Sequence, residues 1–422
     1  MNRRRFLETA LALPVASVFA PLERLTAADR GKAKITGIAM KPVSGLSHTL
    51  IRIDTDAGVS GFGESGVSGS MMKAWIERYG PLLIGEDPLA IQWHFHRMST
   101  LMHPYMARIP ALSGIDMALW DLAGKLVELP VYRLLGGPFR ERVTIFINTE
   151  PRDMLDTAQV KDWADRLREN PQGFQAVKMN TTSPIRRPAG RYTDTLPAGD
   201  VHKIRTGFEN VRKELGPGYD IMAHCHNEYD LPSAVAVARA LEGIDPKWFE
   251  DPLPVPFSGS WVALRRVCRV PLLTGEKLEM PSGFAPFLQN QVVDFIYPDI
   301  AFCGGLTGIM KIAALAELYR IPVATHNVGG ILLTMSSIHF GLSVRDFLTS
   351  ESRLGGRTSI LSMAKNPPEI TGGGAGQPAA PGLGVDLDDE GISQWQRGDD
   401  PPEWFAPPLP EPRSRGRRSG NR

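Results

Sequence analysis

Asp220-Ile-Met-Ala-His-Cys-His226 is a strand-like apolar stretch that ends in imidazole side chains, one of them His224. Similar stretches end in Glu250, Glu276 and His326. The intervals from His224 to Glu250 and from Glu250 to Glu276 are both 26 residues, which accommodates one strand, one helix and two loops. Such units return each strand end to one rim of a parallel barrel, where barrels place their chemistry. We therefore expect these side chains to gather, and three of them to be able to share one metal ion.

The same alternation of strands and helices extends over residues 141–365. Helical segments such as Ser233–Glu242 and Leu306–Tyr319 separate the apolar strands, which favours a parallel sheet with right-handed crossovers. Eight such units indicate an α/β fold of the modified TIM (β/α) barrel type, not an open sheet, and the eighth helix is poorly marked. The eight expected strands are Val143–Thr149, Ala176–Asn180, Asp220–His226, Trp248–Pro252, Pro271–Glu276, Asp294–Asp299, Pro322–His326 and Asp346–Glu351.

Residues 33–140 have a different pattern. Period-2 alternation in Lys34–Met40 and Thr49–Thr55 predicts antiparallel strands. Apolar residues at three- and four-residue intervals then predict helices, of which Ser113–Lys125 is the clearest. A chain of 422 residues is also too long for one ordinary core. The sequence therefore predicts a small α+β domain ahead of the barrel.

The N-terminal residues 1–28 have the layout of a twin-arginine signal peptide. Paired arginines in Asn2–Leu7 precede the apolar run Ala10–Ala20 and the small residues Thr26–Ala28. We expect export to the periplasm, with a frayed N-terminal arm on a cytoplasmic protein as the alternative. No other segment of the sequence is long and apolar enough to cross a membrane.

The C-terminal part is rich in Gly, Pro and Ala. Residues 366–395 contain one short strand-like piece, Gly382–Leu387. Residues 396–422 have little apolar content and many prolines and arginines, so we expect this tail to be disordered.

Bulk composition excludes several classes of protein. The hydrophobic content of 42% and the charged content of 22% are those of a globular protein. A formal net charge of +1 provides no broad field for binding nucleic acid or an anionic membrane. Three cysteines, Cys225, Cys268 and Cys303, do not make a disulfide framework.

Several short fragments share an order and spacing with a known family. They are Gly58–Glu64, Gly114–Lys125, Leu134–Gly137, Phe249–Pro252, Thr274–Glu276, Gly304–Gly308 and Pro381–Val385. Together they resemble the mandelate racemase and muconate lactonizing enzyme group of the enolase superfamily, and most of all its galactonate and sugar-acid dehydratase branch. The resemblance implies an N-terminal capping domain at 33–140, a modified barrel at 141–365, and a segment at 366–395 that returns to the cap. Relatives commonly form homo-oligomers, which we also expect here.

The resemblance implies a metal site at the ends of the third, fourth and fifth barrel strands. In the family each of these strands supplies a carboxylate to one Mg²⁺, and Glu250 and Glu276 match. His224 stands where the family usually has aspartate. Two carboxylates and an imidazole still suit a divalent ion, and the imidazole makes Mn²⁺, Fe²⁺ or Zn²⁺ possible beside Mg²⁺. Alternatively, His224 turns away and the metal site is degenerate.

The family reaction begins with removal of the proton next to a carboxylate, and the resemblance assigns the groups that do this. Asp299 and His326 match the family's Asp–His dyad, so His326 is the expected general base, oriented by Asp299. The racemases and cycloisomerases carry a second base in a Lys-x-Lys motif, but here its second lysine is Asn180. Lys178 is then expected to hold the substrate carboxylate or to stabilise the enediolate.

Further residues point to loss of water. His226 shares a strand face with His224, and in the galactonate dehydratase branch the equivalent histidine protonates the departing hydroxyl. That branch also has Asn at the position of Asn180, a candidate substrate contact here. Glu351 matches a family carboxylic acid that hydrogen-bonds the substrate carboxylate.

Three functions follow from these residues. The first is a divalent-metal-dependent dehydratase that converts an aldonate-like sugar acid to its 2-keto-3-deoxy product, with the sugar configuration left open. The second is an epimerase or racemase that uses His326 and Lys178 on opposite faces of the substrate. The third is a non-catalytic acid-sugar-binding protein with a degenerate metal site.

Overall fold

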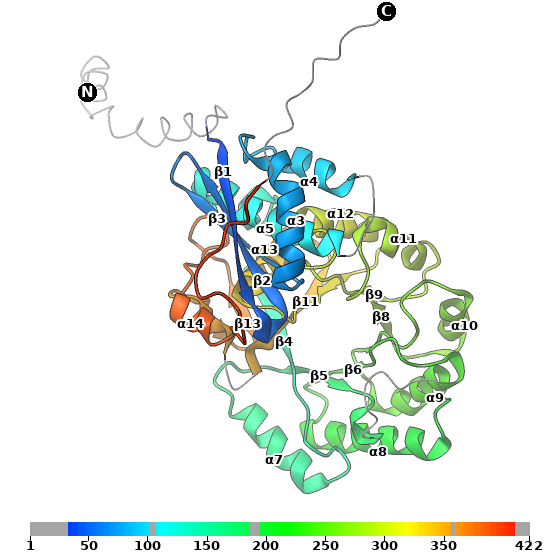
Figure 1. Ribbon diagram of the computed structural model, residues 1–422. Coiled ribbons are helices and arrows are strands. Elements are labelled where there is room, and N and C mark those ends of the chain that lie inside the picture. Colours follow the sequence, from blue (N-terminus) through cyan, green and yellow to red (C-terminus); the bar gives the residue numbers. More distant parts are fainter. Residues whose placement is uncertain (1–32, 102–106, 186–194, 356–358, 410–422) are drawn as a thin grey trace, which may run out of the picture.

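The computed structural model describes residues 33–101, 107–185, 195–355 and 359–409. The expected signal peptide at 1–28 lies outside the described residues. Among the described helices, none combines the length and the apolar character that a membrane span requires. A small N-terminal domain, the cap, lies at one end of the molecule, and the barrel extends from it (Figure 1).

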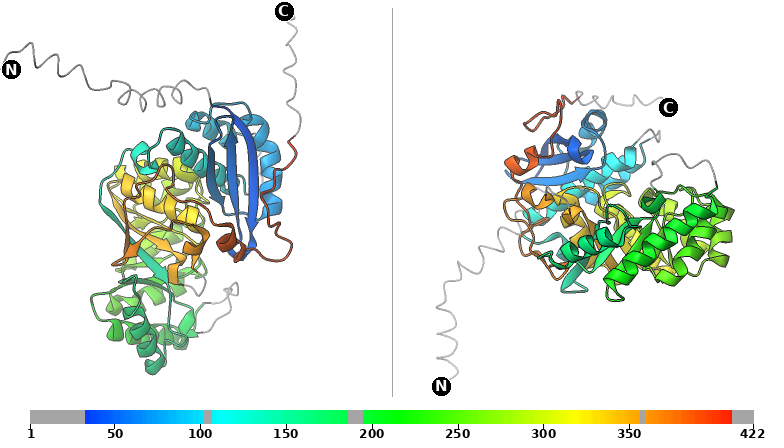
Figure 2. Two further views of the ribbon diagram at one scale, coloured as in Figure 1. Left: turned by 90° about the vertical axis from the view of Figure 1, so that its left-hand side faces the viewer. Right: turned by 90° about the horizontal axis from the view of Figure 1, so that it is seen from below.

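The cap is a three-stranded antiparallel sheet covered by helices. The strands follow one another in the order β1-β2-β3, as period-2 alternation predicted, and Figure 2 shows them side by side next to the helices. The cap elements are β1 (Ile35–Val43), η1 (Ser44–Leu46), β2 (His48–Thr55), β3 (Ser60–Ser65), α3 (Gly69–Leu83), α4 (Ile91–Ser99), α5 (Arg108–Leu126) and α6 (Val131–Leu134).

Helix α5 approaches β3 so closely that only glycine fits between them. A Cβ atom on Gly61 would lie 2.2 Å from the carbonyl oxygen of Ala118, and one on Gly63 would lie 2.1 Å from that of Gly114. This contact fixes β3, and Glu64 with it, against α5.

Eight parallel strands form a closed barrel, which confirms the expected modified TIM barrel with an α+β cap. Neighbouring strands pair in chain order, and β11 pairs back to β4 through Ser350 and Ile145. The strands are β4 (Arg142–Asn148), β5 (Ala176–Asn180), β6 (Asp220–His224), β7 (Trp248–Glu250), β8 (Leu272–Thr274), β9 (Phe295–Ile296), β10 (Val323–Thr325) and β11 (Phe347–Ser352).

Among the described residues, seven α-helices connect the eight strands. They are α7 (Thr157–Arg168), α8 (Ala198–Leu215), α9 (Leu231–Leu241), α10 (Gly259–Val267), α11 (Met280–Gln289), α12 (Gly305–Leu318) and α13 (Ile331–Ser343). Short 3₁₀ turns, η2 (Ser183–Ile185) and η3 (Glu242–Ile244), lie between some of these elements. Strand β11 is followed, within the described residues, by the 3₁₀ turns η4 (Arg353–Gly355) and η5 (Ile360–Met363) in place of an eighth α-helix. This matches the weak pattern of the eighth helix.

The inside of the barrel is filled by a separate apolar layer. Its buried members are Phe146, Met222, Trp248, Leu273, Tyr297 and Ala324. Four of these positions are followed two residues later by a charged or imidazole side chain; the pairs are Met222 and His224, Trp248 and Glu250, Tyr297 and Asp299, and Ala324 and His326. Because side chains two residues apart on a strand share a face, the polar groups form the next layer toward the carboxyl ends of the strands.

The C-terminal segment contacts both domains. It contains β12 (Ile370–Thr371), β13 (Gly374–Gly376) and α14 (Asp389–Ser393), and β13 pairs antiparallel with β4. The backbone N–H of Leu383 donates to Asp121 of the cap at 2.7 Å. Lys41 and Asp389 form an ion pair at 2.6 Å.

The expectation that disorder begins at residue 396 is wrong for residues 396–409. Phe405 and Met40 exchange two backbone hydrogen bonds of 2.9 and 2.8 Å along the edge of β1. The ring of Trp404 lies 5.7 Å from that of Phe62. A few aromatic side chains therefore anchor a segment whose average composition is that of a disordered tail. The rest of the tail, 410–422, lies outside the described residues.

Candidate active site and metal centre

The carboxyl ends of seven barrel strands, β5 to β11, bring seven charged or imidazole side chains into one buried layer. Each is at most 7% exposed. Their proximity follows from the strand–helix period, because each returns to the same rim. They are Lys178, His224, Glu250, Glu276, Asp299, His326 and Glu351.

His224, Glu250 and Glu276 converge as the resemblance implied. His224 Nε2 lies 3.3 Å from Oε1 of Glu250 and 3.7 Å from Oε2 of Glu276. Neither ring nitrogen of His224 has a hydrogen-bond partner among the described residues, although the side chain is buried. A buried polar group left unpaired is costly, and a cation between Nε2 and the carboxylates would remove that cost at Nε2. The residues present therefore fit a divalent metal ion.

Asp251 joins the same cluster, which was not predicted. One ligand atom from each of His224, Glu250, Asp251 and Glu276 lies within 4.8 Å of the others. Alternation along β7 would turn Asp251 away from Glu250. Its φ of 48° breaks the alternation, and its Oδ1 accepts a hydrogen bond of 2.5 Å from Thr274. The signal in the sequence was the second carboxylate of Phe249–Pro252.

Protonation of this cluster also favours a cation. Burial, with Lys178 nearby, holds the pKa of His224 well below its ordinary value, so the ring is the neutral form that binds metals. Burial raises the pKa of Glu250 to about 8, assisted by Glu276 and opposed by Lys178. Burial and Glu276 raise the pKa of Asp251 to about 7. The carboxylates resist ionising together unless positive charge is placed among them.

Lys178 lies between two carboxylates. Its Nζ is 3.2 Å from Oε1 of Glu250 and 2.9 Å from Oε1 of Glu351. Burial alone would lower the pKa of Lys178, but these carboxylates outweigh burial and raise it above its ordinary value. Lys178 is therefore a fixed positive charge in the barrel mouth.

Glu351 reaches the site because β11 carries an irregularity. Val323 of β10 pairs with Phe347, whereas Thr325 pairs with Ser350, so the register shifts between them. The extra residue brings Glu351 inward, where it binds Lys178 and accepts a hydrogen bond from the Tyr297 hydroxyl.

Asp299 and His326 form the expected dyad. His326 Nδ1 lies 2.6 Å from Oδ2 of Asp299, and Nε2 faces Glu276 at 3.3 Å and Glu351 at 3.8 Å. Burial alone would lower the pKa of His326, but Glu276, Glu351 and Asp299 raise it to about 9. With Nδ1–H donated to Asp299, Nε2 is the ring atom that faces the candidate metal cluster and could exchange a proton there.

His226 and Asn180 lie at the edge of this layer. His226 is exposed, just beyond the end of β6, and its ring lies 4.0 Å from that of His224. Asn180 is partly buried, and its Oδ1 accepts no hydrogen bond in the part of the chain that the structure describes. Its backbone N–H donates to Glu150 at 3.0 Å. Glu150 was not predicted, although it follows the first barrel strand as the other site residues follow theirs.

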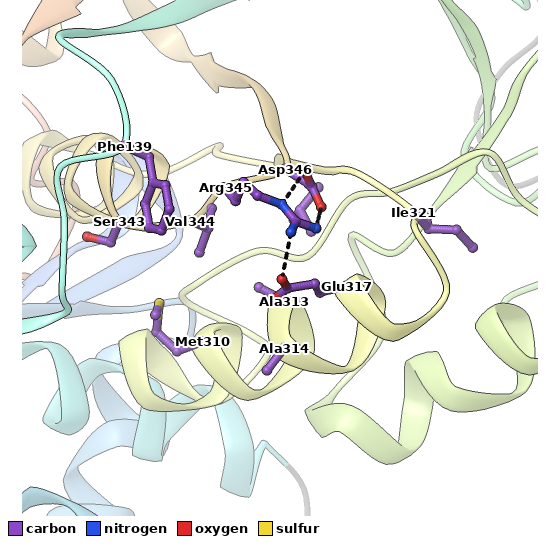
Figure 3. A pocket seen from close by; sticks show the side chains of 11 residues that line it. Phe139, Met310, Ala313, Ala314, Glu317, Ile321, Ser343, Val344, Arg345 and Asp346 are labelled. Carbon is purple, nitrogen blue, oxygen red and sulfur yellow. Dashed lines mark hydrogen bonds and ion pairs between the residues drawn. The ribbon is translucent and has the colours of Figure 1, made fainter.

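A cavity of about 280 Å³ elsewhere in the barrel is separate from this layer. Its lining residues come from α12 and from the amino ends of β10 and β11 (Figure 3). His326 and Glu351 lie at the carboxyl ends of the same two strands. Arg345 crosses the cavity in ion pairs with Glu317 and Asp346. Because it opens at the other end of the strands, we exclude it from the candidate site.

Comparison with known proteins agrees with this geometry. Residues 24–136 match the N-terminal domain of mandelate racemase and muconate lactonizing enzyme, and residues 159–391 match the enolase C-terminal domain-like family. The chain is 32% identical to the D-xylonate dehydratase of Haloferax volcanii, over 84% of this chain and 87% of that protein. It is 28% identical to the D-galactonate dehydratase of Variovorax paradoxus, over 85% and 93%.

Solved structures show the same arrangement of domains. The crystal structure of a mandelate racemase/muconate lactonizing enzyme-like protein from Rubrobacter xylanophilus aligns with a TM-score of 0.79 and 28% identity, covering 87% of this chain and 98% of that one. Both domains and their order thus agree. This chain belongs to the mandelate racemase and muconate lactonizing enzyme family of the enolase superfamily.

Proposed function

We propose that this protein is a metal-dependent hydro-lyase that dehydrates a sugar acid to its 2-keto-3-deoxy product. The observation that carries the proposal is the position of Glu276, which faces His326 at 3.3 Å and His224 at 3.7 Å. A proton acceptor and a metal cluster thus adjoin the same carboxylate. The relatives named as D-xylonate and D-galactonate dehydratases support the choice of sugar acids.

His224, Glu250 and Glu276 would hold the divalent ion. A cation bound there supplies positive charge beside the substrate carboxylate and lowers the cost of negative charge that develops on it. Mg²⁺ suits oxygen ligands, whereas the imidazole of His224 favours Mn²⁺, Fe²⁺ or Zn²⁺. We propose that the protein accepts these transition metals as well as Mg²⁺.

The proton steps are assigned to side chains of the chain itself. His326 Nε2, held by Asp299, takes the proton from the carbon next to the carboxylate. Lys178 contacts that carboxylate and stabilises the negative charge it gains, with Glu351 and Asn180 beside it. His226 then gives a proton to the hydroxyl on the neighbouring carbon as its C–O bond breaks, so that water leaves. The resulting enol rearranges to the 2-keto-3-deoxy acid.

The epimerase alternative requires Lys178 to act as a second base. Lys178 is held between Glu250 and Glu351, and its pKa is raised. A lysine that keeps its proton so firmly is a poor base, which favours dehydration. The binding-protein alternative leaves the buried contact between Asp299 and His326 without a role.

A panel of aldonates incubated with the protein and each divalent ion tests the proposal. We expect 2-keto-3-deoxy product from at least one sugar acid, and none after chelation of the metal. Solvent deuterium in recovered substrate without product would instead indicate epimerisation. Absence of both, with metal bound, would indicate a binding protein.

A further inference from the structure

We propose that two buried carboxylates of the cap, Glu64 and Asp116, act as positioning residues for the Asp299–His326 dyad. Each binds the amino end of the helix that follows one dyad residue. The inference rests on the proposed function, in which this dyad accepts the substrate proton. It adds that the cap orients the proton acceptor as well as covering the barrel.

Glu64 binds the start of α13, which follows His326. Its Oε1 accepts the backbone N–H of Gly330 at 2.6 Å, and its Oε2 accepts that of Leu333 at 3.1 Å. Glu64 is fully buried. The first N–H groups of a helix have no partner within the helix, and negative charge is favourable there. The cap therefore anchors the loop that begins at His326.

His48 contacts the loops that follow both members of the dyad. Its Nδ1 lies 2.8 Å from Oε1 of Glu64. Its ring packs edge-on against Phe302, with centroids 6.1 Å apart, in the loop after Asp299. A Cβ atom on Gly329, in the loop after His326, would lie 2.7 Å from the His48 ring. No larger residue than glycine fits there without displacing His48.

Asp116 makes the equivalent contact with α12, which follows Asp299. Its Oδ2 accepts the backbone N–H of Thr307 at 2.8 Å. Ser113, one turn earlier on α5, accepts the backbone N–H of Gly304 at 3.0 Å. Trp120 donates from Nε1 to the Thr307 hydroxyl at 2.9 Å. One face of α5 thus holds the end of the loop that begins at Asp299.

These contacts place the same constraint on both dyad residues. One β-bridge pairs Asp299 directly with His326. The loops that begin at these two residues end at helices α12 and α13, which the cap holds in place. The 2.6 Å contact between the two side chains therefore depends on how the cap is docked. A shift of either helix would misplace the proton acceptor, and small misplacements are costly for proton transfer.

The test replaces each carboxylate by its isosteric amide, in Glu64→Gln and Asp116→Asn. Glu64 accepts through both oxygens, and an amide has only one acceptor oxygen, so Glu64→Gln leaves that site one acceptor short. Asp116 accepts the helix N–H through Oδ2, so Asp116→Asn keeps this acceptor but removes the carboxylate charge at the amino end of α12. Asp121→Asn is the matched control. Asp121 is a buried cap carboxylate that accepts backbone N–H groups from Phe62 at 2.8 Å and Leu383 at 2.7 Å. Neither partner lies in the loops after the dyad.

The first readout is kinetic and needs an active substrate. We expect Glu64→Gln and Asp116→Asn to lower kcat at least about tenfold with little change in KM, and to raise the isotope effect of deuterium at the carbon next to the carboxylate. The isotope effect does not depend on the fraction of folded enzyme. Loss of kcat without a change in the isotope effect, or the same change in Asp121→Asn, would overturn the proposal.

The second readout is amide hydrogen exchange, which needs no turnover. Glu64→Gln should speed exchange in residues 327–335, and Asp116→Asn in residues 300–309, with Asp121→Asn altering neither. Unchanged exchange in both segments would refute the positioning role even in an active enzyme. If the wild-type protein turns over no sugar acid but the variants show these segment-specific changes in exchange, the proposed function is refuted. The anchoring of the two loops by the cap is then still supported.

A third pair of variants covers the case in which the amides do not fold. In His48→Asn the side-chain amide nitrogen occupies the position of Nδ1 and retains the hydrogen bond to Glu64, whereas His48→Leu removes it. We expect kcat to be retained in the first variant and lowered in the second. Equal kcat in both variants would contradict the role of His48 in orienting Glu64.

Discussion

His326 Nε2 lies 3.3 Å from Oε2 of Glu276, and the same oxygen faces His224 Nε2 at 3.7 Å. One carboxylate therefore links the proposed proton acceptor to the candidate metal cluster. Because a change in the charge of the cluster alters the electrostatic environment of His326, we expect metal binding and proton transfer to be coupled.

The identity of the metal should depend on His224. In His224→Asp the site becomes all-oxygen, which suits Mg²⁺ and weakens the preference for Mn²⁺ or Zn²⁺. We expect the ratio of Mn²⁺ to Mg²⁺ affinity to fall at least about tenfold, because imidazole favours transition metals. Competition titrations measure this ratio in both proteins. An unchanged ratio would mean that His224 is not a ligand.

Metal affinity should rise with pH. In the metal-free protein the pKa of Glu250 is raised to about 8 and that of His326 to about 9. Below these values Glu250 holds a proton and His326 carries a positive charge beside Glu276, and both oppose a cation. Binding should therefore release protons at neutral pH. Calorimetry in buffers of different ionisation enthalpy counts them, and binding without proton release would contradict this arrangement.

The stability of the metal-free protein should fall as the pH rises, whereas the metal affinity should increase. A histidine in the unfolded chain has a pKa of about 6.5, whereas the pKa of His326 in the folded protein is raised to about 9. The contribution of His326 to the free energy of unfolding is therefore complete below about pH 6.5 and is lost as the pH rises through about 9. The raised pKa of Glu250 acts in the same direction. We expect the free energy of unfolding to fall between about pH 6 and about pH 9.

Cation should restore this lost stability. At a cation concentration of about 100 times its Kd, the expected gain in the free energy of unfolding is about 2.7 kcal/mol. Thermal denaturation at several pH values, with chelator or with cation, gives both quantities. A melting temperature that chelation leaves unchanged at every pH would exclude the buried cluster as a cation site.

Lys178 should be required for stability as well as for substrate binding. Lys178→Met leaves Glu351 buried without its counter-charge, at a cost of about 3–5 kcal/mol. Adding Glu351→Gln removes the stranded charge and should recover part of the loss. Chemical denaturation of the single and double variants measures the difference. A double variant less stable than Lys178→Met would show that Glu351 does not depend on Lys178.

The sequence was sufficient to predict the barrel and the gathering of most candidate-site side chains at one rim, because the strand ends recur at a regular interval. His224, Glu250 and His326 all lie two residues after an inward apolar side chain, so their direction follows from alternation. The same rule fails at Asp251, whose positive φ turns it back into the cluster. It gives no reason for the inward direction of Glu351, which depends on the register shift in β11.

The contacts between the cap, the barrel and the C-terminal segment could not be predicted from the sequence. Glu64 belonged to a recognised fragment, but its hydrogen bonds to Gly330 and Leu333 join positions more than 260 residues apart. Trp404 and Phe405 lie in a segment whose prolines and charges outweigh them in composition, although they pack against the cap. Periodicity and short motifs in a single sequence do not indicate which distant residues pair with each other.

Abstraction of the substrate proton by His326 is the central claim, and one comparison tests it most directly. The turnover of wild-type protein and of His326→Asn is measured on the best sugar acid, protiated or deuterated at the carbon next to the carboxylate, with metal content determined in parallel. We predict a primary isotope effect in the wild type and a loss of kcat of about 10²–10⁴-fold in the variant at equal metal content. Turnover by His326→Asn at the wild-type rate would contradict the account.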